Sequence, residues 1–453
     1  MALDASRPTT TPVGVTPPAE PLGFWASYQT ARRNVLELIP RVAYHEPVLT
    51  GGARPGWIMV QDPDAIERVM KTAVDDYPKS SVLKRLMRPR QGSNMIIAEG
   101  EAWRKQRKAM APVFAHRALD ASVPAMTDAA EATCARLGDG GQIDMFPQMV
   151  QATCDVIADV TLSGRDAIDR DVITDSINRF IATVGRISIL DLMNAPRWIP
   201  RPSEILDRSR SEMDRRADEV IAARRARGPS DPPDLLDLLV ASAGDDPDSD
   251  TLIEARNNLT GFLFAGHETT ALSLTWALYL LGLDQSVQDK ARAIAQDTLG
   301  DRAAASADIP HLGYHGQIIE ESLRLYPPAG LLSRTATKPD TLAGKPVKPG
   351  MTVMLPIYAI HRHTELWDDP NGFNPDRFAP EAVAKRHKFA FLPFGAGPRI
   401  CIGYAFAMWE AQVILATLLA RYRFSLPQGF EPDPRMWFTL RPHTGMPLIV
   451  ERL

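Results

Sequence analysis

The sequence is poor in cysteine: 453 residues contain three, Cys134, Cys154 and Cys401. An odd number of widely spaced cysteines in a chain of this length argues against a disulfide framework and favours a reducing compartment. No Cys-x-x-Cys-His sequence occurs, which excludes a covalently attached c-type haem. Zinc and iron–sulfur sites need several cysteine or histidine ligands, and the sequence around Cys401 does not supply them.

The sequence also lacks an uninterrupted apolar run of about 18 residues, and its N-terminus has no charged segment followed by an apolar one. We therefore expect a soluble, cytoplasmic protein without a membrane anchor. A formal net charge of -4 gives no reason to expect nucleic acid as a partner. Prolines concentrated in residues 1–22 predict a flexible or polyproline-like segment, and residues 23–453 are predicted to form one large domain.

One apolar loop, residues 391–403, contains Cys401 directly before a helical pattern over residues 404–422. Its glycines allow backbone N–H groups to approach a thiolate closely. Haem iron accepts a single protein thiolate because the porphyrin supplies the in-plane ligands. A buried structural cysteine is the alternative interpretation.

The loop resembles the haem-binding signature of the cytochrome P450 family, and the match covers Phe394, Gly397, Arg399, Cys401 and Gly403. The resemblance implies b-type haem with Cys401 as the iron ligand, and it places Phe394, Gly395, Arg399 and Gly403 around the cofactor. It also implies a mainly α fold with a smaller β-rich region, the single triangular cytochrome P450 fold.

The second informative stretch, residues 252–282, has a helical pattern that is apolar on nearly every face after Leu259. Within it, Gly266 leaves room for a ligand, Thr269 can bond back to the carbonyl of Ala265, and Glu268 offers a titratable group. A buried helix with an incidental polar patch is the alternative. The segment resembles the family's oxygen-activation motif, which implies that Ala265 and Gly266 contact the haem and that Glu268 and Thr269 deliver protons as catalytic residues.

Two segments contain candidate anion-binding residues. Trp103 and Arg107 lie one turn apart in a basic helical pattern and can address one anion, although a basic helix face is most often only solvated. The family resemblance implies that they contact a haem propionate. It implies the same role for Arg334, which follows Pro327 and Pro328, but an arginine in a strand is equally well a surface residue.

The E-x-x-R sequence formed by Glu321 and Arg324 predicts an ion pair within one helix, a weak interaction if the helix is exposed. Its place between the two motifs resembles the family's arrangement, which implies a buried structural network. Arg377 in the segment 373–378 is the candidate third member of that network.

Several coarser predictions concern the remaining chain. We expect a hairpin from the β-like runs 42–49 and 57–60, a basic irregular loop over residues 78–92, a lid over residues 173–198, β-like runs at 331–336 and 352–360, and a C-terminal hairpin over residues 439–453. Apolar residues predicted to line a substrate pocket, unless they only anchor loops to the core, are Met95, Ile96, Ile97, Leu263 and Leu331.

The resemblance implies a haem-thiolate monooxygenase that inserts one atom of O2 into a hydrophobic small molecule. Electrons are expected from NAD(P)H through a ferredoxin or flavodoxin and its reductase. A peroxide-driven peroxygenase of the same fold and a non-catalytic haem-based sensor are the alternatives. The basic residues expected to form a docking patch for an acidic partner are Arg104, Lys105, Lys108, Lys385, Arg386 and Lys388.

Overall fold

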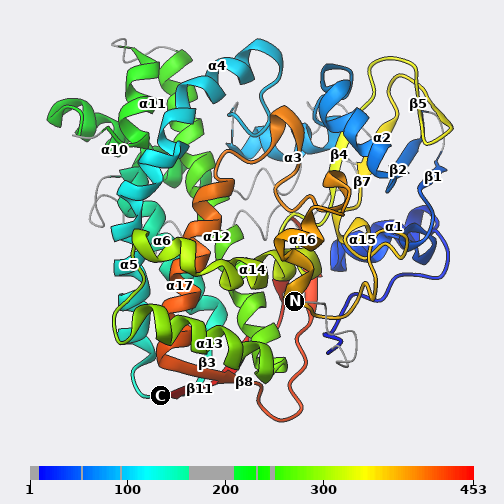
Figure 1. Cartoon of the computed structure of the whole chain (residues 1–453). Coiled ribbons are helices and arrows are strands. Elements are labelled where there is room, and N and C mark those ends of the chain that lie inside the picture. Colours follow the sequence, from blue (N-terminus) through cyan, green and yellow to red (C-terminus); the bar gives the residue numbers. More distant parts are fainter. Residues whose placement is uncertain (1–9, 53–54, 92–93, 163–208, 231–232, 245–249) are drawn as a thin grey trace.

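The computed structural model describes residues 10–52, 55–91, 94–162, 209–230, 233–244 and 250–453, and all structural statements below refer to these residues. Most of them are helical (Figure 1). The α-helices are α1 (Phe24–Arg33), α2 (Pro63–Glu67), α3 (Ser81–Gln91), α4 (Gly100–Met110), α5 (His116–Leu137), α6 (Met145–Leu162), α10 (Ser209–Arg227), α11 (Leu235–Ala243), α12 (Asp250–Leu283), α13 (Gln285–Leu299), α14 (Gly313–Leu325), α15 (Ile357–Ile360), α16 (Pro380–Val383) and α17 (Tyr404–Arg421).

The strands form small sheets. They are β1 (Val48–Gly51), β2 (Trp57–Val60), β3 (Gly140–Asp144), β4 (Leu332–Thr335), β5 (Asp340–Leu342), β6 (Lys345–Val347), β7 (Thr352–Leu355), β8 (Tyr422–Ser425), β9 (Pro434–Met436), β10 (Leu440–Pro442) and β11 (Pro447–Arg452). One sheet has the order β1-β2-β7-β4, with β2 and β7 parallel, and another has the order β3-β11-β8. The remaining strands pair as β5-β6 and β9-β10. The predicted mainly α fold with a smaller β-rich region is confirmed.

Helix α12 organises the helical region. Its 34 residues extend for about 51 Å, and it packs against α6, α11, α14 and α17 (Figure 1). From Ala271 to Gly282 every residue of the helix is buried, which explains why the sequence is apolar on all faces there. The long helix therefore places residues near its middle deep inside the molecule.

Three local predictions, for residues 42–60, 78–92 and 352–360, have different outcomes. The first hairpin is confirmed as β1 and β2, but residues 41–44 form a 3-10 helix. The irregular loop predicted over residues 78–92 is wrong, because residues 81–91 form α3. The β-like run 352–360 is divided: β7 ends before Pro356, which cannot donate to a strand ladder, and α15 follows it.

The C-terminal hairpin is wrong, because β10 pairs with β9 whereas β11 lies between β3 and β8. The flexible or polyproline-like character expected of residues 1–22 stays a prediction, although residues 10–15 contact the rest of the chain. Thr10 bridges Phe373, and the hydroxyls of Tyr279 and Tyr358 accept hydrogen bonds from the backbone N–H groups of Val13 and Val15. The lid predicted over residues 173–198 lies outside the described residues.

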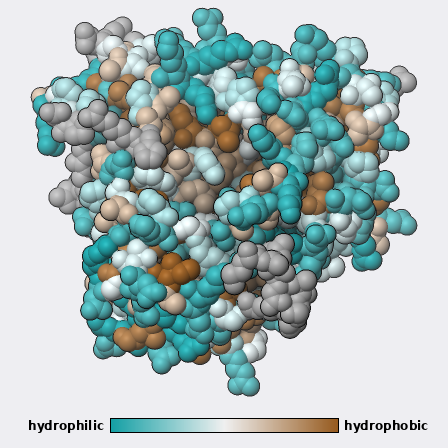
Figure 2. Space-filling view, viewed as in Figure 1, coloured by the Kyte–Doolittle hydropathy of each residue, from teal (hydrophilic) through white to brown (hydrophobic). Residues whose placement is uncertain are grey.

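Among the described helices, none is both long and apolar enough to cross a membrane. The face drawn in Figure 2 is mostly hydrophilic, and apolar side chains gather in a hollow near its upper centre.

Candidate active site

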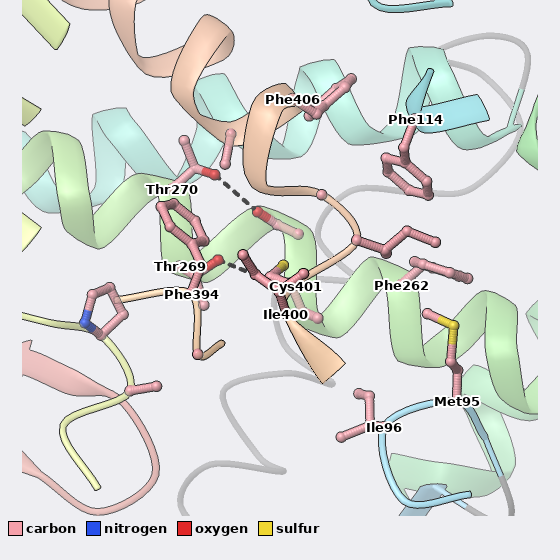
Figure 3. A pocket seen from close by; sticks show the side chains of 18 of the residues that line it. Met95, Ile96, Phe114, Phe262, Thr269, Thr270, Phe394, Ile400, Cys401 and Phe406 are labelled. Carbon is pink, nitrogen blue, oxygen red and sulfur yellow. Dashed lines mark hydrogen bonds between the residues drawn. The ribbon is translucent and has the colours of Figure 1, made fainter. Parts of the chain in front are cut away.

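A cavity of about 340 Å³ lies between α12 and the cysteine loop. Helix α12 lines it with one continuous stripe, Asn258, Gly261, Phe262, Ala265, Gly266, Thr269, Thr270 and Ser273. These positions recur every three or four residues, so they share one helix face. The cysteine loop contributes Pro393, Phe394, Gly395 and Arg399 to Gly403. Figure 3 shows Thr269, Phe394 and Cys401 at one part of the cavity, and Met95, Ile96 and Phe262 at another.

The cysteine loop is held in place by glycine and by a backbone hydrogen bond. Gly397 has a φ of 66°, and a Cβ atom there would lie 2.1 Å from the carbonyl oxygen of Met70, so no larger residue fits. The N–H of Cys401 donates to the carbonyl of Phe394 at 2.9 Å. This arrangement fixes the position of the cysteine at the cavity wall.

The pKa of the Cys401 thiol is subject to opposing contributions. Burial raises its pKa, whereas the backbone N–H of Gly403 and the positive charges of Arg107 and Lys79 lower it. A metal ion in the cavity would replace the thiol proton and remove the desolvation penalty of an unpaired thiolate. The site therefore suits a metal-bound thiolate better than a free one.

Trp103 lies between two arginines that also line the cavity. The guanidinium carbon of Arg399 is 4.0 Å from the indole ring centroid, and that of Arg107 is 5.9 Å from it. Arg107 donates to the carbonyl of Ile400 at 2.8 Å, and Arg399 donates to the carbonyl of Ala98 at 2.7 Å and pairs with Glu99. The structure thus brings Trp103 and Arg107 of α4, which were predicted to contact a propionate, next to Arg399 of the cysteine loop.

Arg334 and Lys79 add two positive charges to this wall of the cavity. Burial, helped by neighbouring cations and opposed in part by Glu99, lowers the pKa of Arg334 to about 10 and that of Lys79 to about 7. The sequence analysis missed Lys79 because it lay in a segment expected to be an irregular loop. Lys79 itself forms an isolated β-bridge with Arg334 of β4, and this contact between distant segments could be found only from the fold.

The residues around the cavity fit haem. Four cations, Lys79, Arg107, Arg334 and Arg399, line the same cavity, and burial lowers the pKa of each, an effect that a bound anion would oppose. The two propionates of haem would supply it, Cys401 would bind the iron, and the remaining wall is largely apolar.

The two predicted catalytic residues face different directions. Thr269 lines the cavity, and its hydroxyl donates to the carbonyl of Ala265 at 2.8 Å. Glu268 is buried but does not line the cavity; its carboxylate accepts a hydrogen bond from Thr439 at 2.7 Å and pairs with Arg441. The structure therefore places Glu268 against the C-terminal segment rather than beside Thr269.

Gly266 has a packing role that the sequence did not reveal. A Cβ atom at this position would lie 2.9 Å from Cδ1 of Ile157 in α6. Because Ile157 also lines the cavity, Gly266 permits both the close packing of α12 on α6 and the shape of the wall.

The E-x-x-R pair lies in a fully buried network. Arg324 donates to both carboxylate oxygens of Glu321, at 2.6 and 2.8 Å, and also to the carbonyls of His361, Pro370 and Gly372. The Nε atom of Arg377 lies 3.5 Å from Glu321. The network ties α14 to the segment before α16.

The predicted pocket residues are only partly placed at the cavity. Met95 and Ile96 line it, whereas Ile97 and Leu263 are buried in the surrounding core and Leu331 packs against another core cluster. The prediction for Leu263 is wrong because this residue does not lie on the face of α12 that lines the cavity. Apolar lining residues that the sequence analysis missed are Phe114, Ile157, Val160, Leu235 and Phe262.

The predicted basic patch is also incomplete. Lys105, Lys108, Lys385 and Lys388 are exposed. Arg104 pairs with Asp75 at 3.0 Å, and Arg386 lies over the rings of Trp367 and Phe378, 4.5 Å from each centroid. Arg386 is therefore a packing residue, and Arg104 is partly neutralised.

Comparisons with known proteins agree with this geometry. The family model described as Cytochrome P450 matches residues 51–448. The chain is 30% identical to a putative cytochrome P450 132 of Mycobacterium tuberculosis, with 87% of this chain and 88% of that protein covered. It is 31% identical to a cytokinin hydroxylase of Arabidopsis thaliana, with 80% and 72% covered, and 30% identical to a cyclooctatin synthase of Streptomyces melanosporofaciens, with 87% of each covered.

A crystal structure of a cytochrome P450DA heme domain matches with a TM-score of 0.77 and 25% identity, and 90% of each chain is covered. The family model spans the cavity, the Cys401 loop and the stripe of α12, so the match includes every part of the site described above. The chain belongs to the cytochrome P450 family and is an oxidoreductase of the haem-dependent monooxygenase type.

Proposed function

We propose that this protein hydroxylates a hydrophobic small molecule with O2, using electrons from NAD(P)H that arrive through a ferredoxin or flavodoxin and its reductase. The observation that carries the proposal is the cavity itself, because Cys401, a cationic wall and the α12 stripe that carries Thr269 all line it. Bound haem would supply the iron that activates oxygen. The free cysteines of the described chain support a reducing, cytoplasmic location.

In this proposal the protein's own residues bind the haem and orient the haem and the substrate. Cys401 would hold the iron, and Lys79, Arg107, Arg334 and Arg399 would orient the propionates. Apolar side chains such as Phe262 exclude water from the other wall. These contacts fix where a substrate C–H bond can meet the reacting centre.

Thr269 is the proposed residue for holding a proton at the reacting centre, because its hydroxyl lies on the cavity wall. Glu268 is proposed to supply protons. Since its carboxylate bonds to Thr439 and Arg441, the side chain must leave these partners to reach the cavity. Glu268→Gln would weaken the pairing with Arg441 and slow turnover by removing the titratable group.

The proposed function is tested with purified holoprotein, NADPH, a ferredoxin, its reductase and a library of apolar compounds under 18O2. The expected result is a product containing one 18O atom. Product formed only with hydrogen peroxide would identify a peroxygenase instead. Ligand binding without product under either condition would identify a sensor.

Thr269→Ala tests the proton-positioning role. Reductant consumption should continue, with hydrogen peroxide released in place of product, because the hydroxyl is needed only after substrate has bound. Thr275→Ala is the matched control, since its hydroxyl donates to the carbonyl of Ala271 in the same way but does not line the cavity. Equal coupling of reductant to product in the two variants would remove Thr269 from the mechanism.

An acidic electron-transfer partner is proposed to dock near Lys105 and Lys108, which are exposed on α4. The rate at which this partner reduces the protein should fall as the salt concentration rises, because salt screens attraction between exposed charges beyond about 8 Å at physiological ionic strength. Lys105→Glu with Lys108→Glu should slow reduction further at low salt. Salt-independent kinetics would argue against this surface.

A further inference from the structure

Most hydroxyl groups of the cavity wall are already used within the protein. Thr161, Thr269, Thr270 and Ser273 each donate to a backbone carbonyl four residues earlier in their own helix. A hydroxyl has one proton to donate, so each of these side chains can donate to a ligand only by giving up its bond to the carbonyl. A donor that needs no such exchange must lie elsewhere on the wall.

Asn258 offers such a donor. It is the first residue of the α12 stripe and is 4% exposed. Its Oδ1 accepts a hydrogen bond from the N–H of Met95 at 2.8 Å, which fixes the orientation of the amide. Among the described residues, no hydrogen bond is made by its Nδ2, which carries two N–H donors.

A second asparagine of the cavity wall, Asn94, differs from Asn258 in its hydrogen bonds. Asn94 also lines the cavity, but its Nδ2 donates to the carbonyl of Asn257 and its Oδ1 accepts from the N–H of Ile96 at 3.1 Å. Asn94 therefore shapes the loop that carries Met95 and Ile96. Asn258 supports the same loop with its oxygen alone and keeps its nitrogen for the cavity.

Apolar side chains line much of the cavity that Asn258 faces. Met95, Ile96, Leu235 and Phe262 line the cavity with it, and the ring of Phe262 stacks on Phe114 with centroids 5.9 Å apart (Figure 3). A buried amide donor costs free energy unless an acceptor meets it. The complementary ligand is therefore an apolar body with one carbonyl or hydroxyl oxygen.

The spacing along α12 sets the length of this ligand. Asn258 and Ala265 are seven residues apart, which places them on the same face and about 10 Å apart along the helix axis, and Thr269 is about 16 Å from Asn258. The acceptor oxygen and the carbon that reacts must be separated by a comparable distance. A short ligand cannot reach both.

We propose that Nδ2 of Asn258 anchors the carbonyl or hydroxyl oxygen of an elongated, otherwise apolar substrate, so that oxidation occurs at the end remote from that oxygen. The assignment rests on the proposed monooxygenase function and adds the substrate class to it. Asn258 is then a specificity-determining residue.

The test compares two probes of equal chain length, 2-dodecanone and dodecane, in equilibrium binding to the holoprotein without reductant. The wild-type protein should bind the ketone about tenfold more tightly, as expected for one buried hydrogen bond. Asn258→Asp keeps an oxygen acceptor for the N–H of Met95 but removes the amide donor. In this variant the two dissociation constants should agree within about twofold, with the value for dodecane unchanged.

Two further variants make the test decisive. Asn258→Leu removes both polar atoms and should abolish the preference as well, whereas Thr260→Val, on the same helix but away from the cavity, should keep it. A ketone preference that survives in Asn258→Asp and Asn258→Leu, or no binding of either probe to the wild type, would overturn the anchor.

Binding without turnover separates the two proposals. A ketone preference with no oxygenated product would support the anchor and contradict the monooxygenase function. Oxygenated product without a ketone preference would support the monooxygenase function and contradict the anchor. With reductant present, the anchor predicts products of 2-dodecanone oxidised near the chain end remote from the carbonyl. Oxidation next to the carbonyl would contradict it.

Discussion

Two clusters of charge differ in how they are compensated. In the Glu321 network, Arg324 is fully buried and its donors meet a carboxylate and three backbone carbonyls. At the cavity wall, Arg399 pairs with Glu99, Lys79, Arg107 and Arg334 line the same space, and burial lowers the pKa of each of the four cations. Arg324 is therefore compensated within the chain, whereas an anion from outside the chain would compensate the four cations at the cavity wall.

This contrast separates structural charges from ligand-binding charges. Loss of either partner of a compensated buried pair destabilises the fold, because the remaining charge is left buried alone. An excess of like charge at a cavity destabilises the empty protein and is relieved by a ligand of opposite sign. Substitutions in the first cluster should therefore act independently of haem, whereas those in the second should act mainly on haem binding.

The largest effect is expected for Arg324→Ala. It leaves Glu321 buried without its main partner, which should lower the free energy of unfolding by about 3–5 kcal/mol. Urea denaturation of the haem-free and haem-loaded protein should show a similar loss in both. Lys290→Ala, which breaks the half-exposed pair with Asp376, is the control and should cost less than about 1 kcal/mol. A loss confined to the haem-loaded protein would contradict a structural role.

Lys79→Met should act in the opposite way. Removing a cation beside Arg334 and Arg399 should leave the haem-free protein as stable as before or more stable. Haem affinity should fall by about tenfold or more, because one charge-assisted contact to a propionate is lost. Transfer of haem to apomyoglobin measures the affinity, and denaturation of the apoprotein measures the stability. A destabilised apoprotein with unchanged haem affinity would place Lys79 in the structural class.

A smaller effect is expected for Glu320, the residue before Glu321. Burial raises the pKa of Glu320 from 4.5 to about 7, and Arg386 opposes this shift. Because the folded pKa is the higher one, stability should fall as pH rises from about 4.5 to about 7. Glu320→Gln should remove this part of the pH dependence, roughly 1–2 kcal/mol given that the side chain is only partly buried. An unchanged pH profile of unfolding would show that Glu320 is solvated.

The sequence predicted the parts of this site that depend on local motifs. Cys401, Thr269, Trp103 and Arg107 all line the cavity as their motifs implied, and the long helix was predicted within two residues at its N-terminus and one at its C-terminus. Such features follow from short patterns because a helix face or a glycine turn is determined within a few residues.

The features that the sequence did not predict depend on contacts between distant segments. Lys79 reaches the cavity because its segment lies beside β4, and Glu268 turns away because Arg441, 173 residues later, pairs with it. Leu263 and Leu331 were expected at the pocket on hydrophobicity alone, which does not determine which face of a helix or strand meets the cavity.

The central claim is that the sulfur of Cys401 binds haem iron, and the spectrum of the reduced carbon monoxide complex tests it most directly. The wild-type protein and Cys154→Ala, which alters a buried cysteine outside the cavity wall, should show the red-shifted Soret band of a thiolate-bound haem. Cys401→His should retain haem and lose that band. Survival of the band in Cys401→His would contradict the assignment.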